Sequence, residues 1–237
     1  MNIWEGVYAS FKEVPASGPG FNGERWTSAS FSKLPQLETP SYNSSLLAVV
    51  AALAGNGSKP VKILDFGGGA GLTYAAMLRS MPKPPKLDCH IVENPGVCAQ
   101  GEKAFSGDKR LRFHRELPKL KGADIIHAQS SLQYIQDWRG LLSKLTGYKA
   151  KYLILTDLPA GDFPTYASAQ VYYESRIPHW FFNLNEVVEL LRNRSYGLTL
   201  KTRFLGTYLG AYGGYPQENF PIENRIGKAY NLLFTRL

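Results

Sequence analysis

The chain has 237 residues, of which 44% are hydrophobic and 19% are charged, and its formal net charge is +8. This length and hydrophobic content suit one ordered domain with a full core and exclude a largely disordered chain. The positive charge favours acidic partners in general. The basic residues are scattered along the chain, however, and they form no dedicated binding arm.

Cysteine usage and apolar runs exclude several further classes of protein. Cys89 and Cys98 are the two cysteines of the chain, and their spacing matches neither a disulfide framework nor a zinc site. The longest apolar run, residues 46–54, is half of a membrane span, and residues 1–10 lack the pattern of a signal peptide. We therefore expect a cytoplasmic protein with no membrane span and no bound metal.

The first 40 residues are rich in Gly, Pro, Ser and aromatic side chains and follow neither a strand period nor a helix period. They predict an irregular N-terminal arm that lies on a domain formed by residues 41–237. A helix is expected at residues 41–55, because Asn and Ser offer N-caps, strong helix formers follow, and Gly55 ends the run.

From residue 61 the sequence alternates between short runs of Ile, Leu and Val and segments of helical character. The runs predict five strands, at residues 61–66, 87–93, 110–117, 123–129 and 150–158. The helical segments between them are residues 71–81, 96–105 and 138–146. This alternation predicts a doubly wound α/β domain whose mostly parallel sheet is covered on both faces.

Residues 159–182 break this alternation and are too long for an ordinary connection, which indicates an insertion that acts as a lid or binds substrate. A helix at residues 183–197 restores the pattern. Two closing strands, residues 198–209 and 228–237, then bring the predicted sheet to seven strands.

The stretch "KILDFGGGAGLTY" (residues 62–74) turns the first predicted strand of this sheet into a helix through four glycines. Glycines at such a turn let the backbone approach a ligand closely. A dinucleotide loop of the form GxGxxG would need glycine where Leu72 or Tyr74 stands, and a phosphate loop would need a lysine after the glycines. Both phosphate-binding patterns therefore fail.

The spacing that fits is an acid followed by alternate glycines: Asp65, Gly67, Gly69 and Gly71. It resembles the nucleotide-binding loop of the class I S-adenosylmethionine-dependent methyltransferases, which have a Rossmann-like fold. The resemblance implies that this loop, Gly68 included, binds S-adenosylmethionine. It also implies an acid at the end of the second strand for the ribose hydroxyls, and Glu93 stands there.

The resemblance further implies a group beside the adenine after the third strand. Glu116 is the predicted residue, and Arg115 or a backbone amide is the alternative. In this family the segment after the fourth strand positions the methyl acceptor. The sequence there, "AQSSLQY" (residues 128–134), lacks the [DNS]PP[YFW] motif of enzymes that methylate nucleic-acid amines, so we expect no nucleic-acid partner.

Four longer stretches give a narrower resemblance: "IWEGVYASFKE", "ILDFGGGAG", "DIIHAQSSLQYIQDW" and "IPHWFFNLNEVVELL". They look like a little-characterised family of bacterial methyltransferases associated with surface-polysaccharide gene sets. This narrower resemblance implies methyl transfer to a small molecule, at a hydroxyl group, with a sugar or glycan precursor as the favoured acceptor.

Methyl transfer to a hydroxyl needs a base, and two histidines are candidates. His127 ends the fourth strand and His179 lies in the insertion. Either could instead be an ordinary buried histidine, as we expect for His90 and His114. The residues predicted to bind the acceptor are Gln129, Ser130, Tyr134, Asp157, Tyr172 and Trp180.

Most other aromatic side chains of the insertion and the C-terminal segment are expected to form a satellite core. Two other functions stay open from the sequence. A nicotinamide-dependent oxidoreductase would bind its nucleotide through the pyrophosphate, which the glycine spacing opposes. A protein that binds S-adenosylmethionine without catalysis would keep the loop and lack a base.

Overall fold

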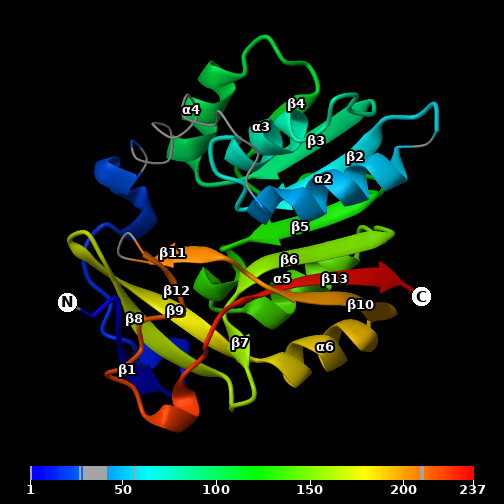
Figure 1. The fold of residues 1–237 in the computed structure, drawn as a ribbon. Coiled ribbons are helices and arrows are strands. Elements are labelled where there is room, and N and C mark those ends of the chain that lie inside the picture. Colours follow the sequence, from blue (N-terminus) through cyan, green and yellow to red (C-terminus); the bar gives the residue numbers. More distant parts are fainter. Residues whose placement is uncertain (1, 27, 29–41, 56, 209–210) are drawn as a thin grey trace.

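A computed structural model describes residues 2–26, 28, 42–55, 57–208 and 211–237. A seven-stranded sheet forms its centre, with strands in the order β10-β13-β6-β5-β2-β3-β4 (Figure 1). The strands are β2 (Val61–Phe66), β3 (Leu87–Val92), β4 (Leu111–His114), β5 (Ile125–Gln129), β6 (Tyr152–Leu158), β10 (Tyr196–Arg203) and β13 (Tyr230–Arg236). The strands from β6 to β4 run parallel, and β13 is antiparallel to both of its neighbours. The predicted α/β fold with a mostly parallel sheet is confirmed.

Helices cover both faces of this sheet, as expected for strands that are apolar along their whole length. They are α2 (Tyr42–Ala54), α3 (Leu72–Arg79), α4 (Pro95–Ala104), α5 (Trp138–Thr146) and α6 (Leu184–Arg192). Short-range caps fix where three of them begin. The side chains of Asn94, Asp137 and Asn183 accept hydrogen bonds from backbone N–H groups in the first turns of α4, α5 and α6.

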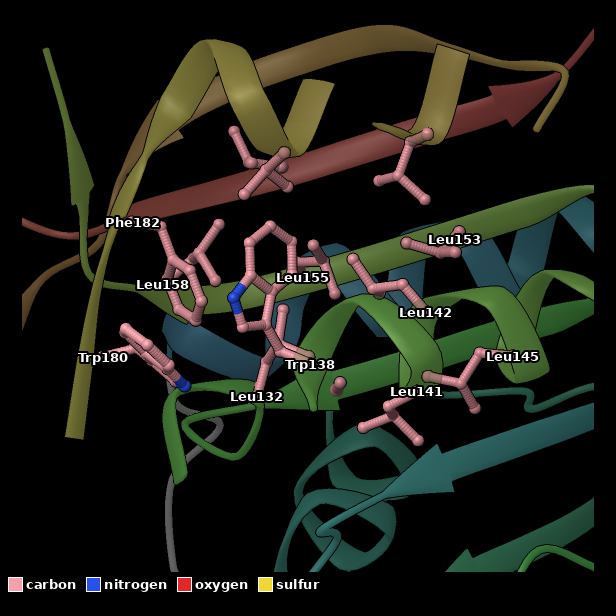
Figure 2. Close-up of a cluster of buried hydrophobic side chains, with 14 of the residues drawn as sticks. Leu132, Trp138, Leu141, Leu142, Leu145, Leu153, Leu155, Leu158, Trp180 and Phe182 are labelled. Carbon is pink, nitrogen blue, oxygen red and sulfur yellow. The ribbon is translucent and has the colours of Figure 1, made fainter. Parts of the chain in front are cut away.

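Two apolar cores lie on opposite faces of the sheet. One contains Leu47 of α2 and Met77 of α3, packed on the strands. The other contains the leucines of α5 and α6 and the indole of Trp138, whose ring contacts Phe182 edge-on at 5.1 Å (Figure 2). This sandwich of helices and sheet fixes the positions of the strand ends, where ligands bind in such folds.

The end of helix α6 and the start of strand β10 differ from the prediction. The helix predicted over residues 183–197 ends at Arg192, and strand β10 begins at Tyr196, before Gly197. Between them Ser195 adopts a left-handed conformation with φ of 63°. A turn here ends the helix earlier than the predicted glycine stop.

A second sheet, in the order β1-β8-β9-β7, stands beside the central one (Figure 1). Its strands are β1 (Trp4–Tyr8), β7 (Ala160–Gly161), β8 (Tyr166–Tyr172) and β9 (Ser175–Asn183). A separate two-stranded sheet consists of β11 (Gly206–Tyr208) and β12 (Ala211–Gly213). The predicted insertion at residues 159–182 is therefore largely a β-hairpin rather than an irregular segment.

The prediction that the N-terminal arm is irregular is wrong for its first residues. Strand β1 pairs antiparallel with β8, so residues 4–8 find their hydrogen-bond partners more than 150 positions away, where no sequence window can detect them. Residues 29–40 of the predicted arm lie outside the described part of the chain. The predicted satellite core of aromatic side chains forms in part: Tyr166, Phe181 and Tyr215 share one buried cluster with Trp4, whereas Phe182 belongs to the core beside α5 and Tyr173 is exposed.

Candidate functional site

A cleft of about 1000 Å³ lies at the carboxyl ends of the central strands. Its walls come from three parts of the chain: the loops after β2, β3 and β5, the N-terminal arm, and the β8–β9 hairpin. The loops contribute residues 66–69, 92–94 and 129–131, the arm residues 16–22, and the hairpin residues 176–178. The cleft therefore has the position that ligands occupy in open α/β sheets.

The glycine loop after β2 lines one side of this cleft through Gly67, Gly68 and Gly69. Gly67 and Gly69 have φ values of 71° and 60°, which glycine adopts without strain. A Cβ atom on Gly68 would lie 2.4 Å from Oδ2 of Asp65, so no side chain fits there. The loop thus presents main chain to a ligand.

Gly71 belongs to the predicted motif but does not line the cleft. It is the N-cap of α3 with φ of 94°, and a Cβ atom there would lie 2.5 Å from the ring of Phe105. Its role is to let α3 begin in close contact with the end of α4.

The carboxylate of Asp65 is buried below the loop, with 4% of the residue exposed. Nδ1 of His127 lies 2.8 Å from Oδ1 of Asp65, and Nε2 of His127 lies 3.2 Å from Oγ1 of Thr156. Thr156 in turn donates a hydrogen bond to Oε1 of Gln129, which lines the cleft. Asp65 therefore supports the glycine loop from beneath.

The prediction that His127 is the base is contradicted by this arrangement. The residue is fully buried, and both ring nitrogens contact protein groups, so neither can reach an acceptor in the cleft. His127 positions Asp65 instead. The prediction placed His127 at the strand end, but it is the third of the five residues of β5, and its side chain faces the interior.

Glu93 lines the cleft directly after β3, as predicted. Burial raises the pKa of its carboxyl, and hydrogen bonds from the backbone N–H groups of Asn94 and Gly69 oppose that rise. The Asn94 N–H lies 2.6 Å from Oε2. The contact with Gly69 joins the acid to the glycine loop and holds both on the same wall.

The prediction for the group beside the adenine is wrong for Glu116. Strand β4 ends at His114, so Glu116 falls in the exposed segment beyond it and does not line the cleft. Arg115, the alternative, does line it. The guanidinium of Arg115 makes long contacts of 3.3 and 3.4 Å with the carboxylate of Glu102.

Four of the six residues predicted to bind the acceptor line the cleft: Gln129, Ser130, Tyr134 and Tyr172. Gln129 ends β5, Ser130 and Tyr134 follow it, and Tyr172 ends β8. The hydroxyl of Tyr134 donates to Oε1 of Gln170 at 2.8 Å, which ties the segment after β5 to the hairpin.

Trp180 and His179 are buried in the hairpin away from the cleft surface, so both predictions are corrected. The indole of Trp180 donates to the backbone oxygen of Ile135 and packs on Phe11. His179 is 1% exposed among the rings of Trp4, Tyr134 and Phe181. Burial lowers the pKa of His179 to about 3, which makes it a poor proton acceptor.

Asp157 lies one layer behind the cleft wall, near the end of β6. Its carboxylate accepts a short hydrogen bond from the hydroxyl of Ser130, which does line the cleft. Asp157 itself does not line the cleft, so the predicted direct contact of its side chain with an acceptor is not supported.

The N-terminal arm contributes cleft residues that the sequence did not identify. The ring of Phe21 contacts Trp26 at 5.0 Å and Tyr134 at 4.6 Å, and Trp26 contacts Tyr172 at 5.5 Å. All four rings line the cleft. The high frequency of aromatic residues in the arm was the one available signal, but their target depends on how the arm folds back.

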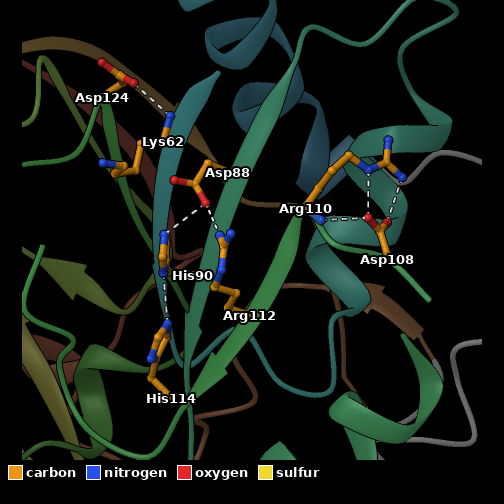
Figure 3. Close-up of polar contacts among 8 residues, drawn as sticks. All are labelled: Lys62, Asp88, His90, Asp108, Arg110, Arg112, His114 and Asp124. Atoms are coloured by element: carbon orange, nitrogen blue, oxygen red, sulfur yellow. Dashed lines mark hydrogen bonds and ion pairs between the residues drawn. The ribbon is translucent and has the colours of Figure 1, made fainter. Parts of the chain in front are cut away.

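Polar side chains on β2, β3 and β4 form a separate group away from the cleft lining (Figure 3). Nδ1 of His90 lies 2.9 Å from Nε2 of His114, and Nε2 of His90 lies 3.2 Å from Asp88, which also pairs with Arg112. Burial lowers the pKa of His90. The expectation that His90 and His114 are structural agrees with these contacts.

The described residues contain neither a metal-binding cluster of side chains nor a membrane-spanning helix. Among them, no group of three or more His, Cys, Asp and Glu side chains could hold a metal ion. Within the same residues, every helix is too short or too polar to span a membrane.

No protein-family model matches the chain, and no curated protein matches it in sequence. Solved structures do match. Magnesium protoporphyrin IX methyltransferase from Synechocystis PCC 6803, with S-adenosylmethionine bound, superimposes with a TM-score of 0.55 at 12% identity, covering 92% of this chain and 93% of that one. The 1,6-didemethyltoxoflavin-N1-methyltransferase of Burkholderia thailandensis, with its substrate and S-adenosylhomocysteine bound, gives a TM-score of 0.55 at 17% identity, covering 94% and 92%.

An S-adenosylmethionine-dependent methyltransferase from Clostridium acetobutylicum gives a TM-score of 0.53 at 12% identity, covering 88% of this chain and 97% of that one. This chain has the methyltransferase fold. The likeness extends over nearly the whole length of these proteins, so the central sheet, the helices and their order are shared. At these identities the comparison establishes the fold alone.

Proposed function

We propose that the protein transfers the methyl group of S-adenosylmethionine to a hydroxyl group of a small molecule. The observation that carries this proposal is that the glycine loop and Glu93 line one cleft at the carboxyl ends of β2 and β3. The sequence resemblance expected these two elements together, and the solved methyltransferases of the same fold bind S-adenosylmethionine or S-adenosylhomocysteine.

The residues of this wall fit the cofactor. A Cβ atom on Gly69 would meet no protein atom within 4 Å, so the main chain there is open to a ligand, whereas the missing side chain of Gly68 makes room for the buried Asp65 carboxylate. The Glu93 carboxylate can accept two hydrogen bonds from the ribose hydroxyls. The loop has Leu72 or Tyr74 where a dinucleotide loop needs its third glycine, and this spacing opposes the nicotinamide-dependent alternative. When bound, the cofactor supplies a methyl group on an activated sulfonium.

The rest of the cleft suits a small acceptor with a ring. Phe21, Trp26, Tyr134 and Tyr172 offer aromatic surface, and Gln129 and Ser130 offer polar groups between them. Aromatic faces pack against the C–H faces of sugars, so a sugar or glycan precursor is the acceptor we propose to test first. A nucleic acid is not proposed, because the motif that holds a nucleobase amine is missing after β5.

Binding separates this proposal from the oxidoreductase. In isothermal titration we expect S-adenosylhomocysteine to bind with micromolar affinity and NADH not to bind. Binding of NADH without binding of S-adenosylhomocysteine would refute the proposal. Methyl transfer is then measured as S-adenosylhomocysteine release, with free monosaccharides, nucleotide sugars and simple phenols as acceptors.

A protein that binds the cofactor without catalysis is the second candidate. It is favoured by the burial of both His127 and His179, which removes the histidines predicted to act as bases. Binding of S-adenosylhomocysteine without methyl transfer to any acceptor would support it.

A further inference from the structure

Two polar residues meet where β5 and β6 end. The hydroxyl of Ser130 donates a short hydrogen bond to Oδ2 of Asp157, and the backbone N–H of Ser130 donates to the oxygen of Thr156 at 3.1 Å. Ser130 lines the cleft, whereas Asp157 is partly buried behind it. The serine hydroxyl therefore connects the cleft to a carboxylate that the cleft does not reach directly.

Both residues adopt a left-handed backbone conformation, which is uncommon for residues other than glycine and which Asp and Asn tolerate better than Ser does. Ser130 has φ of 49° and Asp157 has φ of 51°. Such strain persists only where the surroundings fix it, and it concentrates at functional sites. Here Gln133 donates to the backbone oxygen of Asp157 and the Asp157 N–H donates to Asn231, each at 3.4 Å.

The surroundings of the Asp157 carboxylate favour its uptake of a proton. From the segment after β12, the Tyr215 hydroxyl donates to Oδ1 at 3.3 Å, and Ser130 contacts the other oxygen. Within the described residues, no Lys, Arg or His side chain forms an ion pair or hydrogen bond with this carboxylate. Burial raises the pKa of Asp157 to about 7, and the two hydroxyls oppose that rise.

The other titratable groups of the cleft are less suited to accept a proton. Glu93 lies on the opposite wall beside the glycine loop, and Arg115 and Arg176 are cations. The Tyr134 hydroxyl already donates to Gln170, and burial raises the pKa of Tyr172 well above its usual range.

We propose that Ser130 and Asp157 form a proton relay that deprotonates the acceptor hydroxyl during methyl transfer. This inference rests on the proposed function and supplies the base that His127 and His179 do not provide. Ser130 contacts the acceptor, and Asp157 receives the proton through Ser130.

The proposed step is balanced in atoms and charge. The acceptor oxygen forms a bond to the methyl carbon as the bond between that carbon and the sulfonium sulfur breaks, and sulfur keeps the electron pair. The acceptor proton passes to Oγ of Ser130 while the Ser130 proton passes to the Asp157 carboxylate. The positive sulfonium and the negative carboxylate both become neutral, and the carboxyl later returns its proton to solvent.

The first test observes Asp157 without any acceptor. Carbon-13 NMR of aspartate carboxyls in the complex with S-adenosylhomocysteine should show one resonance that titrates near pH 7 and is missing in Asp157→Asn. Tyr215→Phe, which keeps the ring but removes a hydrogen bond to the ionised form, should raise this midpoint by about one pH unit. A midpoint near pH 4 in the wild type would overturn the relay.

The second test uses whichever acceptor of the panel the wild type methylates. Asp157→Asn should lower kcat by about 100-fold or more, because asparagine tolerates the left-handed backbone but takes up no proton. Wild-type kcat should fall below pH 7, and this acid limb should disappear in the variant. Asp162→Asn, an exposed aspartate after β7, is the matched control and should retain wild-type kcat.

Two outcomes separate failure of the relay from failure of the proposed function. An Asp157→Asn enzyme with kcat within threefold of wild type would overturn the relay while methyl transfer stands. If the wild type binds S-adenosylhomocysteine but methylates no acceptor, the proposed function fails, and the NMR midpoint alone decides whether Asp157 is a proton acceptor. In an active enzyme, the two single variants Ser130→Gly and Asp157→Asn are compared with their double variant. The double variant should lose no more activity than the more damaging single variant, because the two residues act in one proton path.

Discussion

One wall of the cleft comes from two loops that follow consecutive strands, residues 66–73 and 92–94, whereas the other wall combines residues 16–26, 129–135 and 170–178. The first wall is main chain and one acid, held by neighbouring strands of a single sheet. The second is aromatic and hydroxyl groups from an arm, a strand end and a hairpin in a different sheet. The difference implies that cofactor binding depends on local backbone geometry, while acceptor binding depends on long-range assembly.

The largest expected effect tests the backbone geometry of the first wall. Gly67→Ala would place a methyl group 2.4 Å from Cβ of Ser131 at a residue with positive φ. Strain and overlap together should weaken S-adenosylhomocysteine binding by roughly 100-fold in isothermal titration. Gly107→Ala, where a Cβ atom has open space and φ is not positive, is the control and should bind normally. Equal affinity in both variants would show that the loop does not contact the ligand.

The acid of the same wall should have the next largest effect. Glu93→Gln keeps the shape but loses charge-assisted hydrogen bonds to the ribose, so affinity for S-adenosylhomocysteine should fall by about 10- to 50-fold. Glu116→Gln is the matched control, because this acid is exposed beyond β4. If Glu116→Gln bound S-adenosylhomocysteine more weakly than Glu93→Gln, the preference for Arg115 over Glu116 as the group beside the adenine would be refuted.

A smaller effect on acceptor binding is expected from a change in the aromatic wall of the cleft. Phe21→Ala removes the ring contacts with Trp26 and Tyr134, so KM for the acceptor should rise by about fivefold. Affinity for S-adenosylhomocysteine should change by less than twofold, since the glycine loop is untouched. Loss of cofactor affinity without a change in acceptor KM would reverse our division of the cleft into two walls.

The smallest effect concerns stability and its dependence on pH. The folded state holds the Asp157 proton up to about pH 7, whereas the unfolded chain releases it near pH 4. The free energy of unfolding contributed by this group therefore falls as pH rises through that window. Asp157→Asn avoids the loss, so its Tm relative to wild type should be a few degrees higher at pH 8 than at pH 4. Asp162→Asn should show no such trend, and a constant difference for Asp157→Asn would argue against a raised pKa.

Much of the fold follows from patterns that act over short distances. Apolar runs of strand length, separated by capped helices, predicted the parallel sheet, because each element is defined by residues that are near in sequence. The same holds for the glycine loop and Glu93, which end consecutive strands. The prediction for Glu116 failed because β4 stops at His114. The end of that strand is set by its pairing with β3 rather than by its own residues.

Which residues line the cleft was decided by tertiary structure. His127 and Ser130 are three positions apart at the end of β5, and the side of the sheet to which each points separates a buried support from a cleft residue. Phe21 lines the cleft, and the arm that carries it pairs through β1 with a hairpin that lies far away in the sequence. By itself, therefore, the sequence determined the fold and the cofactor wall, whose groups are fixed by local spacing. Only the folded chain brought together Ser130, Asp157 and the aromatic wall, since their contacts join residues that no sequence window contains.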